Sequence, residues 1–272
     1  MIMINTNDQK PSVKPKKRLG QNFLNQIGVI KKLIAAAELG DNQTILEIGP
    51  GTGNLTRELA KTGNRVIAVE KDRELAAILG KEFADAINVE IINADALKFN
   101  ESKIIPPYKI VANLPFYAAA PMIRKFLESG NPPRSMAVIA QKEVAQRICA
   151  QPPRMNLLAL SVQFYAAPNI IGQISRGCFW PVPKVDSAIL RLDLFPKAGE
   201  GCKKEFIDRF FKIAKAGFAH PRKQLAGNLA GGLNISRERA IEWLAKNDLP
   251  RNCRAQDLAV ENWIGLARSF EL

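Results

Sequence analysis

The 272-residue sequence has few of the residues from which metal sites and disulfide networks are built. It contains a single histidine and four cysteines that lie far apart in the chain. Because no Cys-x-x-Cys pair occurs, neither a Cys/His zinc site nor a disulfide framework is indicated. We therefore expect reduced thiols, as in a cytoplasmic protein, and no bound metal.

Long apolar runs are also missing. No run approaches the roughly 18–20 residues that span a bilayer, and residues 1–17 lack the apolar centre of a secretory signal. We therefore expect a cytoplasmic protein with no membrane segment. The apolar fraction of 47% still allows a sizeable core. The length fits one larger domain with a small second one.

Acidic residues are outnumbered by basic ones. Lysine and arginine total 39 and aspartate and glutamate 26, which gives a net charge of +13. Such a surplus favours association with a polyanion, either nucleic acid or an anionic membrane surface, although it also keeps a basic protein soluble. Basic residues gather near the N-terminus, around Lys17 and Arg18, and again in the C-terminal part, around Arg222 and Lys223.

The first two thirds of the chain alternate apolar strands with helices. Continuous apolar strands separated by helices are typical of a parallel sheet that is covered on both faces. We expect strands at residues 44–49, 65–70, 89–95, 109–113 and 136–140, and an edge strand at 187–194. We expect helices at residues 26–39, 54–61, 72–83, 121–127 and 143–149.

After residue 196 only helical patterns follow. Residues 197–203 are rich in glycine and lysine and read as a linker, and helices are expected at 205–215, 222–229, 237–246 and 256–268. Ser236 has the character of an N-cap. The sequence thus predicts a basic flexible tail at 1–18, an α/β domain at 19–196 and a small helical domain at 197–272.

A glycine-rich loop, Glu47-Ile48-Gly49-Pro50-Gly51-Thr52-Gly53, follows the first predicted strand. Glycines let the backbone approach a bound molecule closely. A dinucleotide fingerprint would require a glycine at position 54, which is Asn54. The ExGxGxG pattern instead resembles the loop of class I methyltransferases. A tight turn alone would explain one or two of the glycines, but not the acidic residues at the ends of the next two strands.

Those acidic residues are Glu70, which closes the second strand, and Asp95, which follows the third. Glu70 is placed to accept the ribose hydroxyls of an adenosyl group, and Asp95 to accept the adenine amine. Glycine loop and acids together predict S-adenosylmethionine as the cofactor.

The stretch Asn113-Leu114-Pro115-Phe116 ends the fourth predicted strand. The exocyclic amine of adenine is a poor nucleophile because its lone pair is delocalised into the ring. The amide oxygen of Asn113 and the carbonyl of Leu114 could accept both amine hydrogens and draw the nitrogen toward tetrahedral geometry. Pro115 stiffens the turn, and Phe116 offers a face for a flipped-out base. Such a reaction needs positioning rather than a general base.

This stretch resembles the (N/D)PP(Y/F)-type motif of amino-methyltransferases, in the variant found in ribosomal RNA adenine dimethyltransferases. Further segments resemble the small-subunit members, the KsgA family. They are KRLGQNFL at 17–24, QKEVA at 141–145, FWPVPKVDS at 179–187, and Phe218 with Arg222-Lys223.

The resemblance implies a class I S-adenosylmethionine-dependent methyltransferase fold, Rossmann-like, with a mostly parallel seven-stranded sheet and a small C-terminal all-α domain for RNA recognition. It implies that the cofactor is bound by Asn22, Leu24, Gly49, Gly51, Glu70, Asp95 and Asn113. Phe116 and Phe179 would sandwich the target adenine, and Lys17, Arg18, Arg222 and Lys223 would contact RNA. The implied reaction dimethylates two adjacent adenosines near the 3′ end of small-subunit ribosomal RNA, in a pre-30S particle. We expect a monomer.

Some features depart from the family pattern and keep alternatives open. Pro221 stands where the first arginine of the basic C-terminal element is expected, and residues 151–158 lack a glycine-rich loop. Phe116 replaces a commoner tyrosine. A methyltransferase of large-subunit RNA (the antibiotic-resistance type), a non-catalytic assembly factor and a DNA adenine methyltransferase are the alternatives. Phe116 and Phe179 could also be ordinary core aromatics, and Asn113 could cap a turn.

Overall fold

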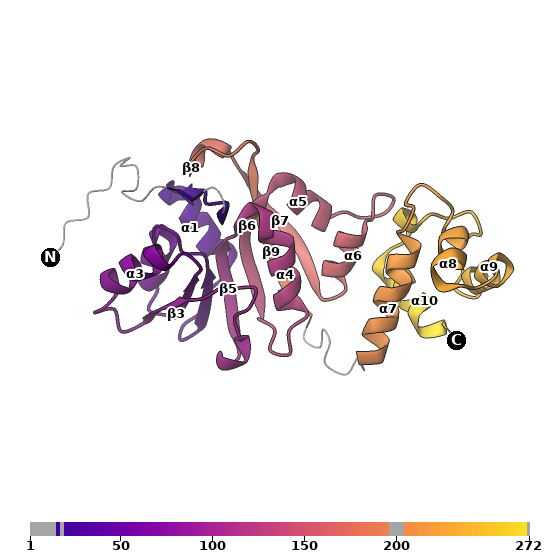
Figure 1. The fold of residues 1–272 in the computed structure, drawn as a ribbon, viewed down its shortest axis with the longest axis horizontal. Coiled ribbons are helices and arrows are strands. Elements are labelled where there is room, and N and C mark those ends of the chain that lie inside the picture. The colour runs from indigo at the N-terminus through magenta and orange to yellow at the C-terminus, as the bar shows by residue number, and fades with distance from the viewer. Residues whose placement is uncertain (1–14, 17–18, 196–203, 271–272) are drawn as a thin grey trace. The chain divides into compact units, whose positions relative to one another are not determined.

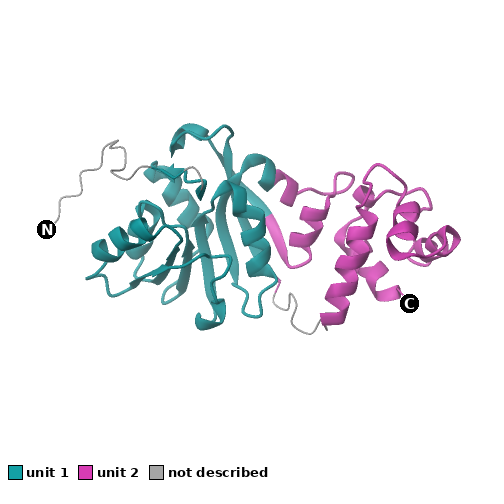
Figure 2. Ribbon diagram, in the orientation of Figure 1, with its two compact units in different colours: residues 1–145, 169–193 teal, residues 146–168, 194–272 magenta. Residues whose placement is uncertain are grey.

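The computed structural model describes residues 15–16, 19–195 and 204–270. The chain forms two compact units, one of Met1–Ala145 with Asn169–Asp193 and one of Gln146–Pro168 with Leu194–Leu272 (Figure 2). The second unit thus also takes in a segment that precedes the predicted boundary at residue 196. The predicted linker at 197–203 and nearly all of the predicted tail at 1–18 lie outside the described residues.

Within the described residues, seven strands form one sheet (Figure 1). In sheet order they are β4 (Val89–Asn93), β3 (Arg65–Glu70), β2 (Thr44–Ile48), β5 (Tyr108–Asn113), β6 (Ser135–Gln141), β9 (Ser187–Leu194) and β7 (Ala166–Ile174). The pairs among β2 to β6 are parallel, and β9 runs antiparallel to β6. This mostly parallel sheet confirms the predicted fold class.

The helices of the first unit are short. They are α1 (Ile27–Ala36), α2 (Asn54–Ala60), α3 (Arg73–Glu82) and α4 (Ala119–Leu127), and α5 (Lys142–Ile148) ends in the second unit. Short 3₁₀ turns lie at Glu101–Lys103, Phe116–Ala118 and Arg176–Cys178. Leu33 of α1 and Leu59 of α2 are fully buried in one cluster with Ile45 of β2 and Val111 of β5. The apolar stripes of α1 and α2 therefore cover one face of the sheet.

The loops after the parallel strands lie at one edge of the sheet. Residue Ile48 pairs with Val69, and Asn113 pairs with Ile139. Because parallel strands run in the same direction, the segments that follow their carboxyl ends meet at the same edge. The segments at this edge include the glycine loop, Glu70, Asp95 and Asn113.

Two elements of the sheet region differ from the sequence-based expectations. Strand β7 was not predicted, because it contains Pro168 and Gly172, which are both uncommon within strands. Proline and glycine are tolerated there because β7 lies at the edge of the sheet. A two-stranded antiparallel pair was also missed, in which β1 (Phe23–Leu24) meets β8 (Phe179–Trp180). This pair joins segments that are far apart in the sequence.

The regular structure of the second unit is helical in its described residues, apart from the first residues of β7 and the last residue of β9. It contains α6 (Leu157–Gln163), α7 (Lys204–Gly217), α8 (Leu225–Leu233), α9 (Arg237–Ala245), the 3₁₀ turn Ala255–Asp257 and α10 (Val260–Ser269). Its core is built around Trp263, which is fully buried. The hydroxyl of Ser236 accepts a hydrogen bond from the backbone N–H of Arg239 at 3.1 Å. The predicted N-cap of α9 is thereby confirmed, whereas α8 and α10 begin three to four residues later than predicted.

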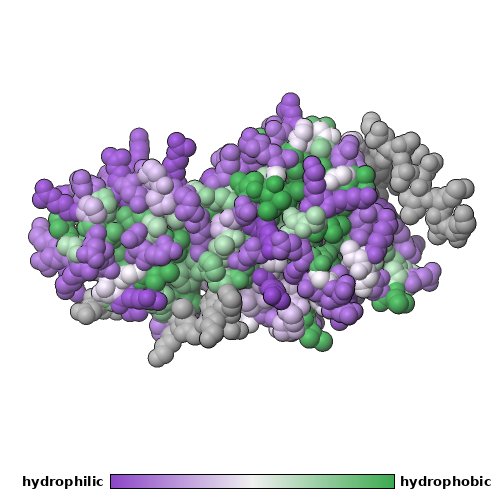
Figure 3. Space-filling model, turned by 180° about the vertical axis from the view of Figure 1, so that it is seen from behind, coloured by the Kyte–Doolittle hydropathy of each residue, from purple (hydrophilic) through white to green (hydrophobic). Residues whose placement is uncertain are grey.

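The surface is mostly hydrophilic, as Figure 3 shows for one face. Among the described residues, no helix has the length and apolar character needed to cross a membrane. The same residues contain no group of three or more His, Cys, Asp or Glu side chains placed to hold a metal ion.

Candidate active site

A pocket that is partly open to solvent lies at the carboxyl edge of the sheet. Its lining brings together the segments 19–24, 47–52, 69–71, 95–96 and 113–117. Every residue that we predicted to bind the cofactor lies in this lining.

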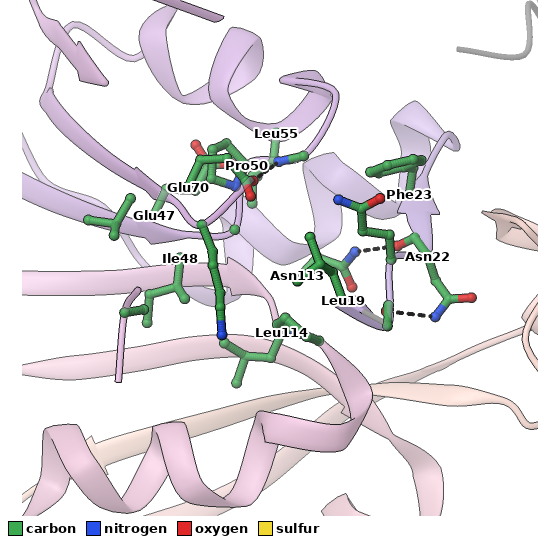
Figure 4. A pocket seen from close by; sticks show the side chains of 18 of the residues that line it. Leu19, Asn22, Phe23, Glu47, Ile48, Pro50, Leu55, Glu70, Asn113 and Leu114 are labelled. Atoms are coloured by element: carbon green, nitrogen blue, oxygen red, sulfur yellow. Dashed lines mark hydrogen bonds between the residues drawn. The ribbon is translucent and has the colours of Figure 1, made fainter. Parts of the chain in front are cut away.

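The glycine loop lines the pocket with residues 47–52, of which Figure 4 labels Glu47, Ile48 and Pro50. Gly49 has a φ of +67°, and a Cβ built on it would meet no atom within 4 Å. The backbone at Gly49 therefore faces open space that a ligand can approach. Gly51 has a φ of +59°, and a Cβ there would lie 2.9 Å from the ring of Phe23. A side chain at Gly51 would push away the segment that closes the pocket.

Glu70 projects from the end of β3 into the pocket lining and is 6% exposed. Its carboxylate accepts hydrogen bonds from the backbone N–H groups of Gly51 at 3.0 Å and Asp72 at 2.7 Å. Burial raises the pKa of Glu70, and these two hydrogen bonds offset part of that rise. Each carboxylate oxygen has a second lone pair, so Glu70 can still accept ligand hydroxyls.

Asp95 follows β4 and is paired with a lysine. Its Oδ2 lies 2.9 Å from Nζ of Lys71, and its Oδ1 accepts a hydrogen bond from the backbone N–H of Leu97 at 3.0 Å. The hydrogen bond from Lys71 lowers the pKa of Asp95 below its ordinary value. Asp95 is thus held as a carboxylate, which can only accept hydrogen bonds.

Asn113 lies at the end of β5, and its two amide atoms are used differently. Nδ2 donates to the backbone carbonyl of Asn22 at 3.0 Å (Figure 4). Oδ1 is buried and has no hydrogen-bond partner among the described residues. A buried acceptor without a donor is costly, so this oxygen is available for a ligand donor. The side chain of Leu114 is buried, and its backbone N–H is fixed by the carbonyl of Ile139 at 3.2 Å.

The aromatic pair predicted to hold the base is adjacent in space. The ring centroids of Phe116 and Phe179 are 6.1 Å apart and the planes are inclined at 74°. Phe116 lines the pocket. Phe179 is 2% exposed and packs in the same core cluster as α1 and α2, with the pairing of β8 to β1 holding its backbone. The stacking of a base on Phe116 and on Phe179 stays a prediction.

The N-terminal segment 19–24 closes one side of the pocket. The side chain of Asn22 turns away from the pocket centre and donates to the carbonyl of Gly20 at 3.1 Å (Figure 4). Asn22 thus faces Asn113 with its backbone carbonyl. Leu24 is 5% exposed, and its carbonyl accepts a hydrogen bond from Asn54 at 2.9 Å.

Glu47 belongs to the lining but was not among the predicted site residues. It is 1% exposed, and neither carboxylate oxygen has a hydrogen-bond partner among the described residues. Burial raises its pKa to about 8, and the nearby hydroxyl of Thr56 offsets part of this rise. An acidic residue within the apolar strand TILEI was the available signal, because a buried carboxyl without a partner is expected only where it has a function. The lining contains the acidic residues Glu47, Glu70 and Asp95 but only one basic residue, Lys71, and this surplus of acids suits a cationic ligand.

The residues predicted to contact RNA are only partly described. Arg222 and Lys223 are exposed in the turn between α7 and α8. Arg254 lies beside them, since Gln224 and Arg254 form an isolated β-bridge. Lys17 and Arg18 lie outside the described residues. A turn that presents several unburied cations suits a phosphate backbone.

Comparison with known proteins gives a consistent result. Residues 12–271 match the family described as "Ribosomal RNA adenine dimethylase". A protein of Dehalococcoides mccartyi named "Ribosomal RNA small subunit methyltransferase A" is 42% identical over 264 residues, with 95% of this chain and 89% of that protein covered. A protein of the same name from Clostridioides difficile is 36% identical, with coverages of 94% and 90%.

Solved structures agree on the fold. A dimethyladenosine transferase from Plasmodium falciparum superposes with a TM-score of 0.75 at 22% identity, covering 89% of this chain and 94% of that one. The 23S rRNA methyltransferase ErmE superposes with a TM-score of 0.73 at 26% identity, covering 91% and 98%. Both likenesses extend over nearly the whole length of each chain.

Proposed function

Because the chain belongs to the ribosomal RNA adenine dimethylase family, we propose that its pocket binds S-adenosylmethionine and that Asn113 presents an adenine amine to it. The protein is a methyltransferase that dimethylates adenine in small-subunit ribosomal RNA. In the finer form of the proposal, the substrates are two adjacent adenosines near the 3′ end of that RNA in a pre-30S particle. The enzyme works as a monomer in the cytoplasm.

The chemistry of the lining supports this cofactor. S-adenosylmethionine has a sulfonium, an ammonium, two ribose hydroxyls and an adenine amine, and when bound it supplies an electrophilic methyl group. Glu47 is a buried carboxyl without a partner that would face the ammonium, since a cation offsets the cost of burying an acid. Glu70 would accept the hydroxyls and Asp95 the amine. Gly49 leaves room for the methionine portion.

The unpartnered oxygen of Asn113 is the observation on which the proposed catalysis rests. Its Oδ1 would accept one hydrogen of the substrate amine, and the carbonyl of Leu114 the other. The nitrogen lone pair is then directed away from the ring and toward the methyl group. By analogy with a preorganised donor in an oxyanion hole, whose loss costs about 10²–10³ in kcat, we expect an effect of similar size here. No general base is required, because the methylated nitrogen loses its proton readily to water.

The substrate base would enter beside Phe116. A base that is methylated on its exocyclic amine has to leave the helix stack, and an aromatic face compensates for the lost stacking. Phe116 supplies that face from the pocket lining. Phe179 would take the other face of the base, after its edge-on contact with Phe116 gives way. Arg222 and Lys223 would hold the RNA backbone from the helical domain.

The proposal is tested by methyl transfer from labelled S-adenosylmethionine to three substrates: under-methylated small-subunit particles, large-subunit RNA and single-stranded DNA. We expect label only in the first, as dimethyladenosine near the 3′ end by mass spectrometry. Label confined to large-subunit RNA would instead match the activity named for ErmE. Label in DNA alone would contradict an RNA substrate.

A second experiment distinguishes an enzyme from a non-catalytic assembly factor. Asn113→Ala should lower kcat at least 100-fold while binding of the small-subunit particle changes less than threefold. Undiminished methylation by Asn113→Ala would refute the role of its amide oxygen.

A further inference from the structure

The segment 19–25, here called the arm, is tied to the first unit by a buried carboxylate that the proposed reaction does not use. Asp72 caps α3, and its Oδ1 accepts hydrogen bonds from the backbone N–H of Glu74 at 3.1 Å and from Nζ of Lys16 at 2.8 Å. Its Oδ2 accepts a hydrogen bond from Nε2 of Gln21 at 3.1 Å. Asp72 is 4% exposed. A helix cap requires only one of these hydrogen bonds.

Gln21 connects Asp72 and Lys16 through both atoms of its side-chain amide. While its Nε2 binds Asp72, its Oε1 accepts a hydrogen bond from the backbone N–H of Lys16 at 2.7 Å. Lys16 in turn reaches the same carboxylate through its side chain. These three residues form a closed set of hydrogen bonds, which we call the latch. Charge-assisted hydrogen bonds of this kind are the stronger ones in proteins.

One residue beyond the latch, the arm determines how the amide of Asn113 is turned. The carbonyl of Asn22 can only accept, so it selects the orientation in which Asn113 presents Nδ2 to the arm. Oδ1 then faces away from the arm without a partner. In the flipped orientation, two oxygens would oppose each other and an N–H group would meet the N–H groups of the substrate amine. The acceptor needed for methyl transfer therefore depends on where the arm lies.

Two further contacts place the arm against the segments that carry Phe116 and Phe179. A Cβ built on Gly20 would lie 2.6 Å from Cδ1 of Tyr117, so the arm backbone packs directly on the residue after Phe116. The backbone N–H of Asn25 donates to the carbonyl of Cys178 at 3.1 Å, next to the pairing of Leu24 with Phe179. The arm thus connects the latch, the amide of Asn113 and the segments proposed to bind the base.

We propose that Asp72 is a positioning residue, which through Lys16 and Gln21 holds the arm so that the carbonyl of Asn22 fixes the amide of Asn113 for methyl transfer. This inference rests on the proposed role of Asn113. It assigns to Asp72 an effect on the chemical step, in addition to any effect on cofactor binding through the arm.

The variant Asp72→Asn tests the latch with little disturbance of the fold. Asparagine is as good an N-cap as aspartate, so Oδ1 still accepts from the N–H of Glu74. Its Nδ2 cannot accept from Gln21, and Lys16 loses its ion pair with residue 72 while it keeps the one with Glu74 at 3.1 Å. The matched control is Asp85→Asn, the same change at an exposed residue just beyond the other end of α3. Gln21→Ala removes the arm's side of the latch and leaves the cap untouched.

We expect Asp72→Asn and Gln21→Ala to lower kcat at least tenfold when both S-adenosylmethionine and RNA are saturating. The KM for S-adenosylmethionine should also rise, because the arm lines the pocket. Hydrogen exchange should become faster in a peptide that covers residues 19–25 and stay unchanged in one that covers β2. Asp85→Asn should match the wild type, and the double variant should be no slower than the slower single variant.

A purely structural role predicts a different pattern. If saturating S-adenosylmethionine restored kcat in Asp72→Asn and Gln21→Ala, the arm would serve cofactor binding only and the inference would be wrong. A fall in kcat without faster exchange in the arm would also overturn it. Failure of the proposed function gives another result, namely full activity in Asn113→Ala. An inactive Asn113→Ala beside a fully active Asp72→Asn would reject the latch alone.

Discussion

Replacing Glu47 by glutamine should make the stability of the cofactor-free protein less dependent on pH. Burial raises the pKa of this carboxyl from 4.5 to about 8, and it is 1% exposed. Between these two values the unfolded chain releases the proton while the folded protein retains it. The unfolded state then binds fewer protons, so the free energy of unfolding falls as the pH rises.

The size of the effect follows from the width of that interval. Each pH unit within it costs the folded state about 1.4 kcal/mol, so the rise from pH 4.5 to pH 8 costs about 5 kcal/mol. Below pH 4.5 the penalty is absent, and above pH 8 it is complete. A loss of this size is comparable to the whole stability of many domains.

Urea unfolding followed by circular dichroism, at intervals from pH 4.5 to pH 8.5, measures the effect. The pH-dependent part of the stability difference between Glu47→Gln and the wild type should grow to about 5 kcal/mol by pH 8. Glu90→Gln, a change at an exposed carboxylate in the same unit, is the matched control and should follow the wild type. Parallel profiles for Glu47→Gln and the wild type would refute the assignment of a buried, protonated carboxyl.

Three further predictions concern the ligand contacts. Phe116→Ala should weaken use of RNA about 5- to 150-fold in kcat/KM, the equivalent of about 1–3 kcal/mol of base stacking, whereas Phe116→Tyr should retain it; equal loss in both would contradict stacking. Gly51→Ala should destabilise the protein by about 1–2 kcal/mol because of its positive φ and raise the KM for S-adenosylmethionine by displacing Phe23; thermal unfolding and steady-state kinetics report the two effects, and a wild-type KM would show that Phe23 does not hold the pocket closed. Replacing Arg222 and Lys223 by alanine should reduce the slope of log affinity against log salt by about 0.7 for each lost contact with single-stranded RNA; an unchanged slope would exclude phosphate contacts there.

Local sequence was sufficient for the parts of the site that come from one strand and its loop. Glycine loop, Glu70, Asp95 and Asn113 follow consecutive strands, and parallel strands bring such residues to one edge without further information. The same reasoning found every strand of the parallel core. It failed for β7, which contains Pro168 and Gly172. These residues are tolerated because β7 is the edge strand of the sheet within the described part of the chain, a position that depends on the rest of the sheet.

The remaining parts of the site depend on contacts between distant segments. Nothing in the neighbourhood of Phe179 indicates that its backbone pairs with residues 23–24. The hydrogen bond from Asn113 to the arm likewise joins residues 91 positions apart in the chain. The resemblance to a known family suggested that these segments meet. Only the folded structure reveals the orientation of the amide, the latch at Asp72 and the buried carboxyl of Glu47.

Stability and function place opposite demands on the buried carboxyls. Burial raises the pKa of both Glu47 and Glu70, so an apolar pocket would make a more stable protein when it is empty. The cost of burying these carboxyls is expected at a site that binds a cation, because the positive charge offsets the desolvation of the carboxylate. Bound S-adenosylmethionine should therefore return the pKa of Glu47 toward 4.5 and flatten the decline of stability between pH 4.5 and pH 8. If the decline persisted at saturating cofactor, the ammonium would have to bind away from Glu47. The buried carboxyl would then destabilise the protein without contacting the ligand.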